Sequence, residues 1–148
     1  MNIVVDGVNI FVATGGCVFD PKKPTVVFVH GSGLDHRSWA LQARWFAFHG
    51  FSVLAPDLPG HSLSEGEPLK SIENMGKWLV KAIKHSGAEN VHLVGHSQGF
   101  LVALEAAILL EDKLKSLTAV ASASAIPVNE SLVDTAQKNT KEAADMLL

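Results

Sequence analysis

The pentapeptide Gly95-His96-Ser97-Gln98-Gly99 fits the pattern G-x-S-x-G and lies between the β-branched run NVHLV and a run of strong helix formers. At such a strand-to-helix turn, a serine hydroxyl is exposed above the strand ends, where it can attack an acyl carbon. The two flanking glycines leave room where the strand and the helix approach too closely for a Cβ atom. The helix N-terminus also favours negative charge that develops there. The pattern therefore predicts Ser97 as a nucleophile.

A second glycine-rich turn, His30-Gly31-Ser32-Gly33, directly follows the apolar run TVVFV. Acyl transfer needs two N–H donors for the oxygen of the tetrahedral intermediate. One donor comes from the residue after the nucleophile, here Gln98, and the other from a flexible loop after an earlier strand. We assign Ser32 as the second donor, with Gly33 as the alternative. A simple tight turn would use the same residue types, so that interpretation stays open.

Four residues near these two turns are expected to border a bound substrate: Gly31, Gly33, His96 and Trp39. All three tryptophans, Trp39, Trp45 and Trp78, stand at helical positions, and this spacing favours packing in the core over a cofactor site. Trp39 follows the glycine-rich turn most closely, so it is the tryptophan expected to touch substrate.

Alternating strand and helix patterns must position the two turns. Asp6-Gly7 joins two β-rich runs and predicts a hairpin. Buried-type strands are expected at TVVFVH, FSVLAPD, NVHLVGHS and SLTAVASAS, and helices lie between them. The second helix has Ser71 as its cap and Gly87 as its stop. This alternation predicts a three-layer α/β sandwich with a mainly parallel sheet.

Composition narrows the function classes. The chain has 148 residues, 47% hydrophobic and 18% charged, which fits one globular domain. Its net charge is −3, and no window of the sequence gathers the basic residues that nucleic acid or an anionic membrane requires. Neither a signal peptide nor a membrane span is recognisable, and the one cysteine, Cys17, excludes a disulfide framework. A cytoplasmic protein with a small-molecule partner is expected.

Three segments together, HGSGLDHRSW, VLAPDLPGHSLS and VHLVGHSQGFLVALEAA, resemble the α/β-hydrolase superfamily, in particular its bacterial esterase-like members. The resemblance implies a serine hydrolase that needs no cofactor and forms an acyl-enzyme on Ser97 from an ester or related acyl substrate. Residues 1–127 would then form the N-terminal part of the core, with about five or six of the family's eight or so strands. Residues 128–148 would begin a lid or cap. Phe100 departs from the pattern, because many relatives have glycine or alanine there.

The general base is the larger departure from the family. Its triad runs in the order Ser, acid, His, but all seven histidines of this chain lie at or before position 96. Asp112, Asp134 and Asp145 follow Ser97, yet none directly follows a predicted strand. The chain is therefore expected to be the N-terminal portion of a hydrolase, inactive or weakly active alone. Its incomplete sheet is expected to associate with a complementing C-terminal fragment or with another copy.

Other interpretations remain beside this one. A catalytically incomplete chain could bind a ligand or a partner without turnover. A dinucleotide-binding unit would use Gly31-Ser32-Gly33 and Asp57, but His36 occupies the place of its third glycine. The spacing of His30, His36, Asp57 and His61 matches no common metal motif, so no metal is expected. The acyl substrate stays open among esterase, thioesterase, lactonase, C–C hydrolase and perhydrolase chemistry. A dehalogenase is disfavoured, because in this family that chemistry uses an acid at the position of Ser97.

Overall fold

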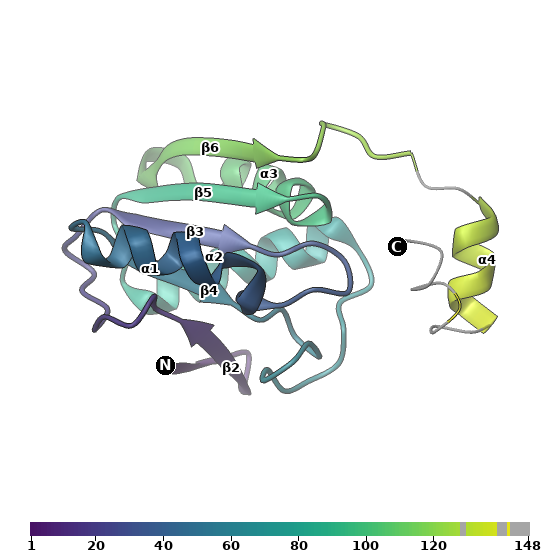
Figure 1. Ribbon diagram of the computed structural model, residues 1–148, viewed down its shortest axis with the longest axis horizontal. Coiled ribbons are helices and arrows are strands. Elements are labelled where there is room, and N and C mark those ends of the chain that lie inside the picture. The colour runs from purple at the N-terminus through teal and green to yellow at the C-terminus, as the bar shows by residue number, and fades with distance from the viewer. Residues whose placement is uncertain (128–129, 139–141, 143–148) are drawn as a thin grey trace.

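A computed structural model of the chain describes residues 1–127, 130–138 and 142, and Figure 1 shows its elements. Six strands form one sheet in the order β1-β2-β4-β3-β5-β6. The strands are β1 (Asn2–Val5), β2 (Val8–Ala13), β3 (Thr25–Val29), β4 (Ser52–Pro56), β5 (Val91–His96) and β6 (Leu114–Val120). The helices are η1 (His36–Trp39), α1 (Ala40–Phe48), α2 (Ile72–Ser86), α3 (Gln98–Leu110), η2 (Glu111–Lys113) and α4 (Glu130–Lys138).

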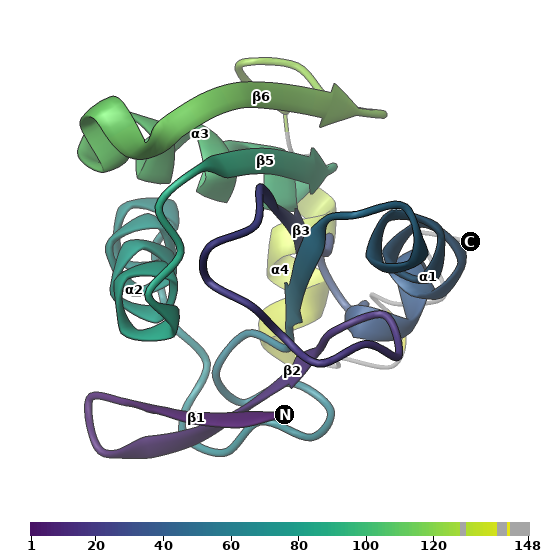
Figure 2. The same cartoon turned by 90° about the vertical axis from the view of Figure 1, so that its left-hand side faces the viewer.

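The sheet is mainly parallel and has helices on both faces. Strands β4, β3, β5 and β6 run parallel, whereas the β1–β2 hairpin joins β4 in antiparallel pairing. Helix α1 covers one face, and α2 and α3 cover the other (Figure 2). Every residue of β3 and β4 is buried, as expected for apolar runs covered on both sides. The predicted three-layer α/β sandwich is confirmed.

Local signals placed the turns and helix ends correctly. Asp6 and Gly7 have φ values of 52° and 81° and join β1 to β2 with Val5 opposite Val8. At the start of α2, the Ser71 hydroxyl accepts a hydrogen bond from the Asn74 N–H at 3.2 Å. Gly87 ends the helix in the left-handed conformation.

The last strand differs from its prediction. The sequence indicated a strand over 116–124, but β6 begins at Leu114 and ends at Val120. Its end is set by tertiary bonding: the Ser97 N–H donates to the Val120 carbonyl, and the backbone then turns at Ala121, where φ is 46°. Helix α4 lies in the predicted lid segment, beyond the carboxyl ends of the strands (Figure 1). Residues 128–129, 139–141 and 143–148 lie outside the described residues, so the domain division stays a prediction.

Two apolar clusters fill the space on either side of the sheet. The larger lies under α2 and α3, and the smaller lies under α1 around Phe28 and Trp39. Trp39 and Trp78 are buried as predicted, but Trp45 is 55% exposed, so the core prediction is wrong for it. Trp45 lies on the side of α1 that faces away from the sheet. Among the described helices, none is long and apolar enough to cross a membrane.

Candidate active site

Ser97 forms a strained turn between β5 and α3. Its φ and ψ are 52° and −125°, a sparsely populated combination for a residue with a side chain. Three hydrogen bonds hold the turn: the Ser97 N–H donates to the Val120 carbonyl at 3.1 Å, and the Ser97 carbonyl accepts from the Phe100 N–H at 3.0 Å and the Ser122 hydroxyl at 2.9 Å. Such a conformation persists because its surroundings over-determine it. The strand-to-helix turn that the G-x-S-x-G pattern indicated is therefore present.

The flanking glycines are required by close backbone contacts. A Cβ atom at Gly95 would lie 2.5 Å from both the Phe100 nitrogen and the Gly99 oxygen. A Cβ atom at Gly99 would collide with the carbonyl oxygens of Val29, the last residue of β3, and of His30, which follows it. The helix therefore begins directly against the sheet, and this contact fixes where the Ser97 turn stands.

The second glycine-rich turn lies directly beside Ser97. A Cβ atom at Gly31 would be 3.2 Å from the Ser97 Cβ and 3.0 Å from the His96 Nδ1. The Leu34 N–H donates to the Gly31 carbonyl at 3.2 Å, and Gly33 has a φ of 68°, so residues 31–34 form a tight turn. Ser32 and Gly33 are exposed at its tip. The structure thus brings together the two segments chosen as oxyanion donors, while the choice of the Ser32 and Gln98 N–H groups stays a prediction.

Trp39 forms part of the wall behind this turn. Its side chain is 6% exposed, with its ring centroid 4.9 Å from that of Phe28 and 6.5 Å edge-on from that of His96. The indole Nε1 is buried and has no hydrogen-bond partner. Trp39 therefore supports His96 from the core side, and its predicted contact with substrate is not established by this position.

His30 connects the glycine-rich turn at residues 31–34 to the loop after β4. The side chain is fully buried, with Nδ1 3.0 Å from the Gly31 carbonyl, and Nε2 accepts the Leu58 N–H at 3.2 Å. A neutral imidazole with its proton on Nδ1 satisfies both partners. Burial lowers the pKa of His30, because the imidazolium would lose its hydration. If His30 carried a proton on Nε2, that N–H group would face the Leu58 N–H, and two donors would oppose each other.

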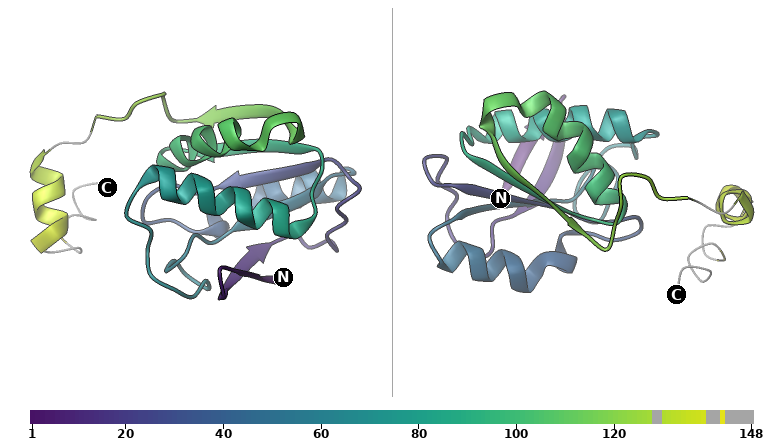
Figure 3. Two further views of the ribbon diagram at one scale, coloured as in Figure 1. Left: turned by 180° about the vertical axis from the view of Figure 1, so that it is seen from behind. Right: turned by 90° about the horizontal axis from the view of Figure 1, so that it is seen from above.

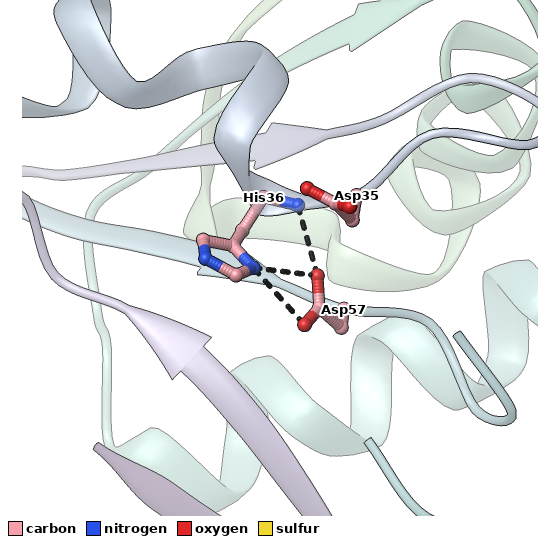
Figure 4. A group of neighbouring side chains, drawn as sticks. All are labelled: Asp35, His36 and Asp57. Carbon is pink, nitrogen blue, oxygen red and sulfur yellow. Dashed lines mark hydrogen bonds and ion pairs between the residues drawn. The ribbon is translucent and has the colours of Figure 1, made fainter. Parts of the chain in front are cut away.

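A buried carboxylate makes the second connection between the same two loops (Figure 4). Asp57 is fully buried, and its Oδ1 accepts the backbone N–H of His36 at 2.8 Å. The His36 Nδ1 lies 2.9 and 3.0 Å from the two carboxylate oxygens, and the Leu63 N–H donates to Oδ2 at 3.2 Å. Sequence reasoning missed this pair, because its members are 21 residues apart and match no motif. A carboxylate committed in this way cannot bind a ribose, which argues against the dinucleotide interpretation.

The same group contains atoms that could ligate a metal. Asp35, His36 and Asp57 offer one ligand atom each within 4.8 Å of one another. However, Asp57 is bonded directly to His36, and Asp35 accepts a hydrogen bond from the Arg37 Nε at 2.9 Å. This bond from Arg37 holds the pKa of the Asp35 carboxyl well below its usual range. Protein donors already satisfy these ligand atoms, so the group forms an internal hydrogen-bond network.

Ser97 has no general base within the described residues. Five histidines bond elsewhere: His30 and His36 as above, His49 to the Trp45 carbonyl, His61 to the Pro59 carbonyl and His92 to the Ser116 hydroxyl. None of the seven, all of which are described, bonds to the Ser97 hydroxyl. The arrangement supplies a positioned serine and a facing turn, but not the proton acceptor that the serine needs.

Comparisons with known proteins agree with this geometry. A family model described as "alpha/beta hydrolase fold" matches residues 24–143. The chain is 33% identical over 110 residues to the pimeloyl-(acyl-carrier protein) methyl ester esterase of Methylococcus capsulatus, covering 74% of this chain and 39% of that protein. It is 30% identical over 118 residues to epoxide hydrolase 2 of Siraitia grosvenorii, covering 78% of this chain and 36% of that protein.

A solved structure shows the same fold. The esterase of Exiguobacterium antarcticum matches with a TM-score of 0.81 at 18% identity, covering 99% of this chain and 59% of that one. The chain therefore spans between 36% and 59% of the length of these three proteins.

Proposed function

Because the chain belongs to the alpha/beta hydrolase fold family, we propose that it carries the nucleophile of a serine hydrolase that acts on an ester or related acyl substrate. One observation supports this above all others: Ser97 is held in a strained turn at the start of α3, with the Gly31 turn pressed against it. Strain of this kind is retained where function needs a side chain presented in one direction.

In the proposed reaction, the Ser97 Oγ attacks the acyl carbon and forms a tetrahedral intermediate. The N–H groups of Gln98 and Ser32 hold the negative oxygen. The intermediate collapses to an acyl-enzyme as the alcohol or thiol leaves with the proton taken from Ser97, and water then releases the acid. A base must carry that proton, and we propose that a histidine and an acid outside the described residues supply it.

Chemistry favours an acyl substrate over an epoxide, although both kinds of hydrolase are among the relatives. A serine that opened an epoxide would form an ether, which water does not readily cleave. A carboxylate nucleophile would form an ester instead, and the ester could be hydrolysed. Since this position holds Ser97, only an acyl substrate gives an intermediate that turns over.

The test is covalent labelling with a fluorophosphonate probe, followed by denaturing intact mass spectrometry. We expect one adduct on the wild-type protein, none on Ser97→Ala, and an unchanged adduct on Ser38→Ala, which removes an exposed hydroxyl from η1. An adduct that persists in Ser97→Ala would reject Ser97 as the nucleophile. Absence of any adduct on the wild-type protein in the presence of the segment that supplies the base would reject the acyl-enzyme mechanism.

A second candidate function, binding without turnover, is favoured by the open edge of the sheet. Among the described strands, β6 pairs only with β5, and most of its residues are exposed. On the neighbouring helix α3, Ile108 and Leu109 are also exposed. We propose that this edge accepts a further strand from a complementing C-terminal fragment or from another copy of the chain. Light scattering after size exclusion tests the association: a stable monomer of the 148-residue chain would reject it.

A further inference from the structure

Helix α1 has an unusual distribution of side-chain sizes. Its inward side presents the small residues Ala43 and Ala47, both buried. Its outward side presents Leu41, Trp45 and Phe48, which are 80%, 55% and 62% exposed. Positions four and three residues apart share one face of a helix, so these three side chains form a continuous stripe opposite the buried alanines. We refer to Leu41, Trp45 and Phe48 as the α1 ridge.

The small inward residues have a local cause. The loop after β2 crosses α1 so closely that a Cβ atom at Gly15 would collide with the Ala43 carbonyl and lie 2.8 Å from the Ala47 Cβ. The same loop passes beside the ridge, because a Cβ atom at Gly16 would lie 3.9 Å from the Phe48 ring. Two residues further on, Val18 is 93% exposed. The loop thus fixes the orientation of α1 and extends its apolar surface.

The ridge is also held in place by ring contacts. The Trp45 indole stacks on the His49 imidazole with 4.0 Å between centroids and 12° between planes. The Arg44 guanidinium lies over the Phe48 ring, 5.6 Å from its centroid. These contacts keep two large aromatic groups facing solvent, where each exposes apolar area at a cost in free energy.

The charged side chain that contacts the ridge is Arg44. The sequence from 37 to 56 contains no Asp or Glu. Arg44 lines a surface hollow of about 450 Å³ at the flank of the ridge, between α1 and the loop after β2. Arg37 lines the same hollow, but its guanidinium is paired with the Asp35 carboxylate. The loop continues past Asp20 to Lys22 and Lys23, which are exposed.

We propose that the α1 ridge is an interfacial docking surface for an anionic phospholipid bilayer. Leu41, Trp45 and Phe48 would enter the boundary between headgroups and acyl chains, and Arg44 would contact lipid phosphates at the adjoining hollow. Helix α1 is the outermost described layer on its side of the sheet (Figure 3). A ridge on the outside of that layer can reach a planar, deformable interface. A groove-binding helix would need a concavity along the ridge itself. A symmetric contact with a second copy would bring Arg44 near its own counterpart with no acid to pair.

The proposal is tested by sedimentation of the protein with vesicles of phosphatidylcholine alone or with one quarter phosphatidylglycerol. We expect binding to the anionic vesicles that is weakened on the order of tenfold or more by Leu41→Ser with Phe48→Ser, and similarly by Arg44→Glu. Two matched controls lie away from α1: Val4→Ser on β1, which removes another exposed apolar side chain, and Lys84→Glu on α2. Neither control should change binding.

Fluorescence provides a readout that does not depend on these variants folding. Brominated anionic vesicles should quench Trp45 in the wild-type protein but not the buried Trp39 and Trp78, and Trp45→Phe should abolish the quenching. The proposal is overturned by absence of binding, by equal loss in Val4→Ser, or by a dimer that the ridge variant disrupts. Ser97→Ala should bind vesicles like the wild type, so a failure here is distinct from a failure of the proposed catalysis.

Discussion

Replacing the buried carboxylate of Asp57 should remove a large part of the stability of the fold. Asp57→Asn keeps the shape of the side chain but removes its charge. The carboxylate accepts hydrogen bonds from the His36 N–H, the His36 Nδ1 and the Leu63 N–H, whereas an amide offers only one oxygen. The NH₂ group of the asparagine would then face one of these N–H donors, and Asp57 is fully buried, so water could not bridge the two groups.

The magnitude follows from burial. Leaving a buried donor without its acceptor costs about 1 to 3 kcal/mol for each donor, against a total stability of about 5 to 15 kcal/mol for an ordinary domain. The matched control is Asp6→Asn, which removes a carboxylate 2.8 Å from the Lys81 ammonium where both side chains are more than half exposed. That change should cost less than about 1 kcal/mol, because water screens the pair and asparagine suits the Asp6 turn.

Urea unfolding followed by tryptophan fluorescence and far-UV circular dichroism measures both changes. His36→Ala completes a double-mutant cycle with Asp57→Asn, and we expect a coupling energy of at least about 1 kcal/mol. If Asp57→Asn is too unstable to purify, the unfolding free energy of His36→Ala still measures the stability that is lost when the His36–Asp57 pair is removed. Unfolding free energies for Asp57→Asn and Asp6→Asn that agree within about 1 kcal/mol would refute the assignment of Asp57 as the connection between the two loops.

Three further changes probe the same fold. Because the folded-state pKa of His30 is lowered, the unfolded chain binds the proton first as pH falls below about 6.5. Stability should therefore decline with a slope approaching about 1.4 kcal/mol per pH unit in urea titrations, and His30→Gln should remove that slope. Gly99→Ala should lower the melting temperature by a destabilisation of about 3 kcal/mol, although helix propensity alone favours alanine, because its Cβ meets backbone oxygens. Ser71→Ala should cost about 1 kcal/mol in the same melts through loss of the α2 cap.

Signals confined to neighbouring residues predicted much of this fold. Asp6-Gly7, Ser71 and Gly87 each act through backbone conformation or a bond within a few residues, so their meaning survives without the tertiary structure. The G-x-S-x-G turn belongs to the same class. Its glycines are explained by contacts of α3 with β3 and β5, which any strand-to-helix turn of this kind must make.

Features that depend on distant segments were missed. The end of β6 is set by the Ser97 N–H, which no strand propensity records. The outward position of Trp45 follows from the loop that crosses α1 at Gly15, so helical spacing alone could not separate it from the buried Trp39. The His36–Asp57 pair likewise joins residues whose proximity exists only once β3 and β4 are adjacent in the sheet.

The two halves of the candidate site are held by different parts of the chain. Ser97 is fixed from β6, through Val120 and Ser122, whereas the facing turn is fixed from the loop after β4, through His30 and Asp57. Neither set of bonds includes the missing base, so the serine and its facing turn are preorganised independently of it. Since positioning is the part of catalysis that a fold must supply in advance, a base that reaches Ser97 needs only to accept the proton.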